Sequence, residues 1–247
     1  QMCIRDSSGA HVCVCFATNG EYASEADAAV RTAESRSVLA ALGVTAEQIY
    51  FLGYPDTGMP YEESFLRRLY DGCRVSASRW GRTETWRPDG QDFHFMRSGC
   101  HSTYTAASVL RDLSDVLALV NPDTVYVTAP GDCHGDHDAL GRFTTQAVAA
   151  MENPPALYYY LIHADRTDIW PERDAERFRL PPMAADHPLL RCAAERRPLP
   201  DGFPPAEKYS LIQSYTSQDP AAYNGYLLAF AKNDELVFRV ERLPSRT

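Results

Sequence analysis

One short segment of this 247-residue sequence concentrates side chains that can bind a metal ion or move a proton. The segment PGDCHGDHDAL contains His134, His137, Asp132, Asp136 and Asp138. Imidazole nitrogen and carboxylate oxygen together suit zinc or a similar divalent metal, and a neighbouring aspartate can fix the tautomer of an imidazole. The same residues also fit a polar turn that only shapes the backbone. The segment alone leaves both interpretations open.

A second group of polar side chains follows two other candidate strands. The turn TNGE closes the first of these strands, and Asp56 follows the second in YPDTGM. Arg31 and Glu34 lie three residues apart in a candidate helix between them. Taken singly, Arg31 and Glu34 are typical of a solvated ion pair, and Asp56 is typical of a turn after proline. If the strands are parallel, their carboxyl ends meet at one edge and bring this group to the histidine segment.

The elements that would position these residues alternate between strand and helix. This alternation predicts an α/β fold with a doubly wound, mainly parallel sheet flanked by helices. Apolar runs predict strands over residues 11–17, 48–53, 124–129, 157–162 and 235–242. Apolar stripes and capping residues predict helices over residues 24–42, 61–70, 103–120, 139–151, 207–218 and 221–232.

Two segments lack this periodicity. Residues 71–99 are predicted to form a loop insertion, and residues 164–205, rich in proline and arginine, are expected to wrap the surface. Four aromatic side chains in the insertion either stack on a sugar or form a small satellite core, and they are Trp80, Trp86, Phe93 and Phe95.

Composition excludes several classes of protein. The net charge is −9 and no block of lysine and arginine stands out, which argues against a nucleic-acid partner. No run approaches the ~18 apolar residues that a membrane-spanning helix needs. Seven cysteines without a Cys-x-x-Cys pair predict free thiols rather than a disulfide framework or a zinc ribbon. We expect a cytoplasmic globular protein, and the sequence does not indicate its oligomeric state.

Four stretches together resemble the LmbE-like family, which includes the PIG-L-type N-acetylglucosaminyl de-N-acetylases. In chain order they are HVCVCFATNGE; RTAESRSVLAALGV with YFLGYPDTGM; NPDTVYVTAPGDCHGDHDAL; and YYYLIH with the later KYSLIQSYTSQ. The resemblance implies a single Rossmann-like domain over residues 9–247, with residues 71–99 unmatched. Because the four stretches occur in the family's order, the resemblance favours a functional histidine segment over a simple turn.

The resemblance implies zinc-dependent hydrolysis of the N-acetyl amide of an N-acetylglucosamine-type sugar conjugate, with Zn²⁺ or another divalent metal as cofactor. By motif matching, His137 is a metal ligand. His134 is the general acid or oxyanion stabiliser, and Asp136 orients its imidazole.

Further residues acquire roles from the same match. Arg31 and Asp56 correspond to positions that contact the sugar substrate. Glu34, Asp132 and His163 are weaker candidates, expected to support the site from behind. The expected partner is therefore a small sugar or glycoconjugate.

One motif of the family is missing. The family's opening strand ends in His-Pro-Asp-Asp-Glu, which supplies two zinc ligands and the general base, and this sequence contains no such segment. Residues 1–8 (QMCIRDSS) show no periodicity and are not a signal peptide, so we interpret them as a non-native leader. We therefore expect a domain truncated at its N-terminus, without the first strand and helix, and inactive as it stands.

Two other functions stay open at this point. The chain fits a non-catalytic sugar- or nucleotide-binding α/β domain, because the metal motif is missing. It also fits a metal-dependent phosphoesterase on a similar sheet, although such sites usually gather more carboxylates and often two metals.

Overall fold

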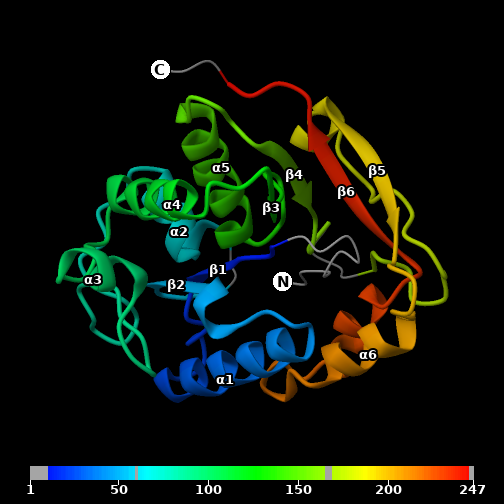
Figure 1. Cartoon of the computed structure of the whole chain (residues 1–247), viewed down its shortest axis with the longest axis horizontal. Helices are drawn as coiled ribbons and strands as arrows, with labels where there is room; N and C mark the ends of the chain where they lie inside the picture. The colour runs from blue at the N-terminus through cyan, green and yellow to red at the C-terminus, as the bar shows by residue number, and fades with distance from the viewer. Residues whose placement is uncertain (1–10, 59–60, 165–168, 245–247) are drawn as a thin grey trace.

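The fold is α/β, as the alternation of apolar patterns predicts, and the computed structural model describes residues 11–58, 61–164 and 169–244. The leader predicted for residues 1–8 lies outside the described residues. Figure 1 shows helices on both sides of the strands that carry the sequence motifs.

Two βαβ units carry these motifs, and their elements are β1 (Val14–Thr18), α1 (Glu25–Ala41), β2 (Ile49–Tyr54), β3 (Thr124–Thr128), α5 (Gly135–Ala150) and β4 (Ala156–Tyr160). Within each unit the two strands are parallel neighbours. A parallel pair needs a crossover connection, which α1 and α5 provide. The carboxyl ends of both strands in a unit therefore lie at the same edge.

The two units belong to two hydrogen-bonded sheets in the described part of the chain. β1 and β2 form one sheet, whereas β3 and β4 continue into β6 (Asp234–Val240) and β5 (Cys192–Pro198) in the order β3-β4-β6-β5. β6 is antiparallel to both β4 and β5. The mainly parallel arrangement predicted from sequence thus holds for β1 to β4, and the C-terminal strands depart from it.

Strand β5 lies in the segment that we expected to wrap the surface without regular structure. Its sequence, CAAERRP, is polar, and its residues alternate between half-buried and exposed. An edge strand of this kind gives no apolar run, because only one of its faces touches the core. The strand β5 is recognised only from its antiparallel pairing with β6.

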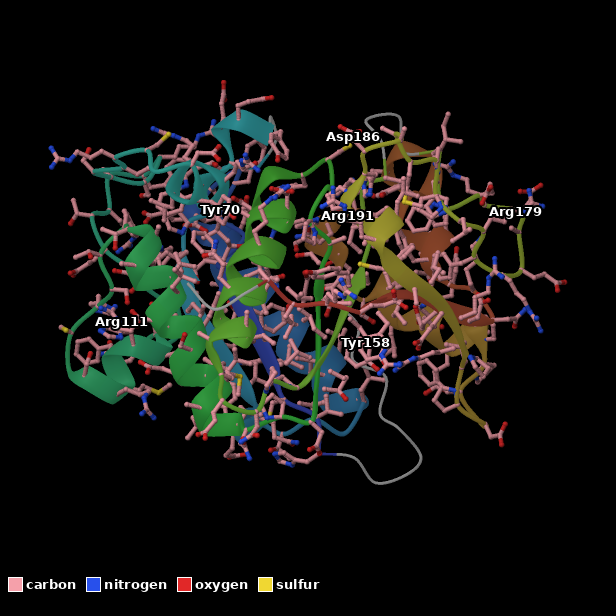
Figure 2. The ribbon with its side chains drawn as sticks, turned by 90° about the horizontal axis from the view of Figure 1, so that it is seen from above. Tyr70, Arg111, Tyr158, Arg179, Asp186 and Arg191 are labelled. Carbon is pink, nitrogen blue, oxygen red and sulfur yellow. The ribbon has the colours of Figure 1, made fainter. Side chains whose placement is uncertain are left out.

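One apolar core packs α2 (Phe65–Tyr70) and α4 (Ala106–Val120) against α5 and β2. The predicted stripe of α4 is buried there, with Val109 and Leu113 among its members. Figure 2 shows Tyr70 of α2 on this side of the molecule and Arg179 at the opposite end. Among the described helices, none combines the length and apolarity that a bilayer crossing requires.

Short helices complete the chain, namely η1 (Ala46–Gln48), η2 (Tyr61–Glu63), α3 (Phe93–Ser98), η3 (Pro188–Arg191), α6 (Pro205–Gln213), η4 (Thr216–Gln218), α7 (Ala222–Gly225) and η5 (Leu227–Phe230). The helix α3 falls in residues 71–99, where sequence periodicity indicated a loop. The helix predicted over residues 221–232 is divided between α7 and η5.

The start of α5 places the histidine segment on a helix. The sequence predicts a helix from residue 139, but α5 begins at Gly135 with His134 as its N-cap. The Nδ1 atom of His134 accepts a hydrogen bond from the backbone N–H of Asp136 at 3.2 Å, which satisfies one free donor of the first turn. Asp136 and His137 therefore project from a helical turn with a fixed direction.

Candidate active site

The chain segments that follow β1, β2, β3 and β4 come together, and within each parallel pair the carboxyl ends lie side by side. The backbone N–H of Asp56, after β2, donates to a carboxylate oxygen of Glu21, after β1, at 3.2 Å. The backbone N–H of Cys133, after β3, donates to the carbonyl of His163, after β4, at 2.9 Å. These contacts connect strand ends that are far apart in sequence and define the site.

Three side chains at this edge form a group that can hold a cation. One ligand atom each from Asp56, His134 and Asp136 lies within 4.8 Å of the other two. Asp136 is buried, and its Oδ1 accepts a hydrogen bond from the backbone N–H of Leu66 at 2.7 Å. Its Oδ2 is buried without any hydrogen-bond partner in the described chain. A buried carboxylate oxygen left without a partner is costly, and a metal ion would satisfy it.

Carboxyl groups crowd this site. Burial, together with the negative charge of Asp56, raises the pKa of Asp136 well above its usual value. Glu21 is only 1% exposed, and burial raises its pKa to about 7. One of its oxygens, Oε1, is buried without a hydrogen-bond partner. Carboxylates this close and this desolvated need either protons or a cation, which is the electrostatic signature of a functional site.

Glu21 was not selected as a site residue from sequence. The turn TNGE placed it at the end of β1, but a lone glutamate in a turn carries no specific signal. Its backbone contacts Trp80 of the 71–99 segment, whose indole N–H donates to the Glu21 carbonyl at 2.9 Å. Such a long-range contact cannot be inferred from spacing along the chain.

The imidazoles of the site form a stack. The rings of His134 and His137 lie 4.5 Å apart, and those of His137 and His163 lie 5.5 Å apart. Burial, with the neighbouring His137 and His163, lowers the pKa of His134 to about 3. His134 is therefore neutral at physiological pH, which is the form that binds metals. Tyr226, which sequence reasoning did not select, extends the stack with its ring 5.4 Å from that of His163.

Asp132 ties the ends of β3 and β4 together. Its carboxylate is buried and accepts hydrogen bonds from the backbone N–H groups of His134, Ile162 and His163 at 2.9 to 3.1 Å. Burial alone would raise its pKa, but His137, His163 and these hydrogen bonds together lower it. Asp132 thus joins the backbone segments that carry His134 and His163.

Two predicted roles differ from the arrangement that the structure shows. His137, matched to a metal ligand, is not in the three-residue group, and its Nδ1 lies 3.3 Å from a carboxylate oxygen of Asp132 without a hydrogen bond. The carboxylate of Asp136, expected to orient His134, binds Leu66 instead. The contact to the His134 ring comes from the backbone N–H of Asp136, because both residues lie in the first turn of α5.

Arg31 and Glu34 of α1 face different partners. An Nη atom of Arg31 lies 3.6 Å from a carboxylate oxygen of Asp56, so this arginine borders the site. Glu34 lies behind it and accepts hydrogen bonds from the hydroxyl of Thr216 and from the backbone N–H and hydroxyl of Ser217, at 2.5 to 2.8 Å. Figure 1 shows α6, which precedes η4, beside α1. Glu34 therefore fixes η4 next to the site.

A divalent metal fits the donor set of the three-residue group. Two carboxylates and one neutral imidazole are ligands that zinc accepts. The Oδ2 atom of Asp136 is buried without a hydrogen-bond partner, so it is available as a metal ligand. Arg31 adds a positive charge and hydrogen-bond donors at the rim. The arrangement suits the activation of water next to a polar substrate.

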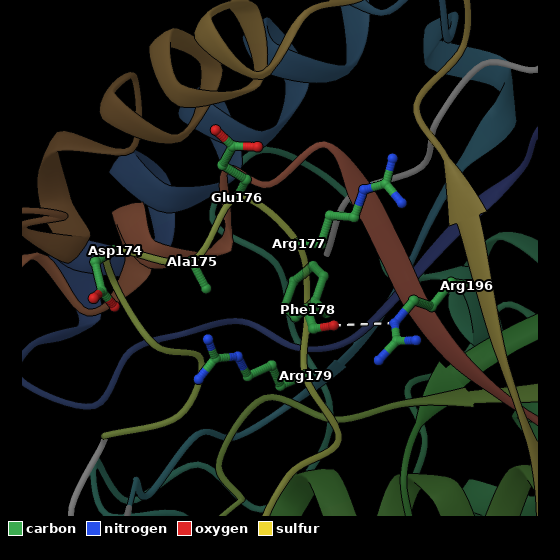
Figure 3. A pocket seen from close by; sticks show the side chains of 7 residues that line it. All are labelled: Asp174, Ala175, Glu176, Arg177, Phe178, Arg179 and Arg196. Carbon is green, nitrogen blue, oxygen red and sulfur yellow. Dashed lines mark hydrogen bonds between the residues drawn. The ribbon is translucent and has the colours of Figure 1, made fainter.

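A cavity of about 510 Å³ lies elsewhere on the molecule. It is lined by residues 174–179 and Arg196, and Figure 3 shows the side chain of Arg196 turned to the carbonyl of Phe178, to which its Nε donates at 3.0 Å. None of the predicted site residues lines it. The chemistry of the strand edge is therefore separate from this cavity.

The chain is similar to one protein family and to known structures. The family described as GlcNAc-PI de-N-acetylase (PIG-L) matches residues 2–148, more than half of the chain, including the strand ends after β1, β2 and β3. Solved structures similar to the chain include the crystal structure of the antimicrobial reagent A40926 pseudoaglycone deacetylase Dbv21. It has 14% sequence identity and a TM-score of 0.43, and the match covers 96% of this chain and 100% of that chain. A search of curated proteins gives no significant match.

Proposed function

Because the chain belongs to the PIG-L family of GlcNAc-PI de-N-acetylases, we propose that it is a zinc-dependent hydrolase that removes the acetyl group from an N-acetylglucosamine-type sugar conjugate. The observation that carries the proposal is the group formed by Asp56, His134 and Asp136, whose ligand atoms lie within 4.8 Å of one another at the edge where the strands end. The convergence of these ligand atoms on one point, together with the raised pKa values of Asp136 and Glu21, favours a catalytic site over a binding domain without chemistry.

The residues that would hold the metal are Asp56, His134 and Asp136, and His137 is the alternative imidazole ligand. Zinc, when bound, supplies a Lewis acid for the amide carbonyl and an activated water. Glu21, whose pKa of about 7 suits proton transfer near neutral pH, would be the proton acceptor beside this group. Arg31, 3.6 Å from Asp56, would donate hydrogen bonds to hydroxyl groups of the sugar.

The metal site is tested first by zinc binding, which does not require turnover. We expect the purified chain to bind one zinc ion in calorimetric titration, and Asp136→Asn to weaken that affinity about 100-fold or more. Asp174→Asn, an exposed change in the distant cavity, is the matched control and should bind zinc like the parent chain. Equal affinity in all three proteins would contradict the site.

The same titration assigns the imidazoles. If His134 is the ligand, His134→Ala loses zinc and His137→Ala keeps it. The opposite result would restore the assignment that the sequence motif implies.

The reaction itself is tested with the methyl glycoside of N-acetylglucosamine. We expect the zinc-loaded chain to bind this sugar, and acetate release then measures hydrolysis. The inactivity expected from the sequence stays a prediction, and binding without acetate release would agree with it. Hydrolysis of a phosphoester instead of the amide, or no sugar binding at all, would contradict the proposed function.

A further inference from the structure

The 71–99 segment brings an exposed aromatic side chain to the rim of the active site. Trp80 is 39% exposed, and its indole N–H donates to the carbonyl of Glu21 at 2.9 Å. The carboxylate of Glu21 in turn accepts the backbone N–H of Asp56 at 3.2 Å. Two hydrogen bonds, both made by Glu21, therefore link Trp80 to the backbone of Asp56, a residue of the metal-binding group.

A second exposed ring lies next to it. Tyr22, 43% exposed, follows Glu21 in sequence. Its ring packs so closely on Gly58 that a Cβ at this glycine would lie 2.6 Å from the ring. The backbone N–H of Gly58 donates to the carboxylate of Asp56 at 2.7 Å, so the Tyr22 ring also borders the turn that carries a site residue.

Arg79 holds the two rings in place. Its guanidinium lies 5.1 Å from the centre of the Tyr22 ring and 5.6 Å from that of Trp80, and it donates to the carbonyl of Tyr22 at 3.0 Å. The turn behind it is fixed by Ser78, whose hydroxyl accepts the backbone N–H groups of Trp80 and Arg82 at 3.3 and 3.1 Å. The rings thus form a preorganised surface, which lowers the entropic cost of binding.

The other aromatic residues of the segment do not share this exposure. Phe93 is 2% exposed and belongs to the main core, and Trp86 lies under the guanidinium of Arg82, 3.8 Å from the ring centre. Phe95 is half-buried against His101. Of the four aromatic residues considered from sequence, Trp80 is the one that is exposed and hydrogen-bonded to a residue beside the site.

We propose that Trp80, Tyr22 and Arg79 form a subsite for the part of the substrate attached to the N-acetylglucosamine ring, and that this part presents a flat face, either the C–H face of a second sugar or an aromatic ring. The proposal rests on the proposed function, because it assumes that the acetylated sugar lies at Asp56. A rigid aromatic surface continuous with the site stacks on such a face, and the guanidinium beside it adds a cationic contact.

Calorimetric binding to three probes tests the subsite in the zinc-loaded chain: methyl N-acetyl-β-glucosaminide, its p-nitrophenyl counterpart and N,N′-diacetylchitobiose. We expect the chain to bind at least one of the two larger probes about fivefold or more tightly than the methyl glycoside. Preference for the p-nitrophenyl probe would indicate an aromatic group, and preference for the disaccharide would indicate a second sugar.

Trp80→Ala should reduce that preference to within about twofold and leave the affinity for the methyl glycoside unchanged. Trp80→Phe keeps a ring and should keep most of the preference. Met96→Ala, 62% exposed in the same segment, is the matched control and should bind all probes like the parent chain.

The outcomes separate the two proposals. If the parent chain binds the methyl glycoside but shows no preference, or if Trp80→Ala keeps the preference or weakens all probes equally, the subsite is wrong and the proposed function stands. If the parent chain binds none of the probes, the proposed function fails and the subsite fails with it.

Discussion

Glu21 shows how much of this site depends on the environment of single residues. A glutamate in a surface turn would be ionised at neutral pH, but burial raises the pKa of this one to about 7. The folded chain therefore prefers the protonated form over a range in which the unfolded chain has already released the proton. This difference makes the stability of the protein depend on pH.

The sign of that dependence follows from proton linkage. In metal-free buffer, the contribution of Glu21 to the free energy of unfolding is largest below its ordinary pKa of 4.5 and is lost as the pH rises to about 7. Glu21→Gln cannot ionise, so it should escape this loss, by up to about 3 kcal/mol. We expect urea denaturation to show the variant more stable than the parent at pH 8 and similar to it at pH 4.5.

The control for this experiment is Glu63→Gln, an exposed change in η2. It should follow the pH dependence of the parent chain. If the free energy of unfolding of Glu21→Gln changes with pH as that of the parent does from pH 4.5 to pH 8, then Glu21 is not protonated in the folded state. Its assigned role in accepting a proton is then wrong.

The sequence predicted which residues form the site better than it predicted the contacts that their side chains make. His134, Asp136, Asp56 and Arg31 meet at one edge, as motif order and parallel topology predicted. The directions of the His134 and Asp136 side chains could not be predicted, because they depend on where α5 begins. A start at Gly135 rather than residue 139 turns the carboxylate of Asp136 to Leu66 and leaves its backbone N–H for His134.

Among the elements, α5 positions the site because its first turn fits tightly against η2. At Gly135, a Cβ would overlap the carbonyl oxygen of Tyr61 and lie 2.7 Å from the Cβ of Ser64. Only a glycine allows the helix to approach so closely. The imidazole and carboxylate of the site project from this same turn, so the fit of the helix sets their positions.

Gly135→Ala should therefore force α5 away from η2. We expect a loss of about 2 kcal/mol or more in the free energy of unfolding, as for other overpacked sites, together with weaker zinc binding. Urea denaturation and calorimetric zinc titration measure the two effects.

Gly99→Ala, at the C-cap of α3 with φ of +77° and nothing within 4 Å of the added carbon, is the control. It should cost about 1 kcal/mol through backbone strain alone and leave zinc binding unchanged. Unaltered zinc affinity in Gly135→Ala would show that α5 does not set the site.

The elements that the sequence predicted well have strong local signals. Helix α1 begins after Ser24, whose hydroxyl accepts the N–H of Asp27, and α4 has a continuous apolar stripe. The strand β5 and the division between α7 and η5 were missed. Strand β5 has no apolar run and depends on its pairing with β6, and the apolar pattern over residues 221–232 does not indicate where the helix is interrupted.

In the described residues the strands belong to two sheets and the core consists of three apolar clusters, of which the largest shares Val125, Leu140 and Leu243 with the cluster of the four-stranded sheet. One apolar cluster contains Leu52 and Tyr54 of β2, Val109 of α4 and Phe143 of α5. Helices therefore bridge the two sheets where no strand pairing does so in the described residues. The order of elements predicted the α/β class, but the separation into two sheets depends on hydrogen bonds between strands distant in sequence, which composition and periodicity do not report.

A core shared in this way predicts a single cooperative unfolding transition. Phe143 is 1% exposed, and its ring packs edge-on against Tyr70 at 5.1 Å. We expect Phe143→Ala to lower the free energy of unfolding by about 3–5 kcal/mol and to shift one transition followed by both fluorescence and circular dichroism.

Leu119→Ala on the exposed side of α4 is the control, with an expected change below about 0.5 kcal/mol. Two separate transitions in Phe143→Ala, one for each sheet, would show that the helices do not join the molecule into one cooperative unit.

The contact between Glu34 and Ser217 has a consequence for the timing of assembly. It joins residues 183 positions apart, and it holds η4 beside the helix that carries Arg31. During synthesis, the N-terminal βαβ unit leaves the ribosome long before Ser217 is added to the growing chain, and closing so long a loop is entropically slow. The wall of the site next to Arg31 is therefore completed late, and nascent chains hold an open rim until translation has passed Ser217.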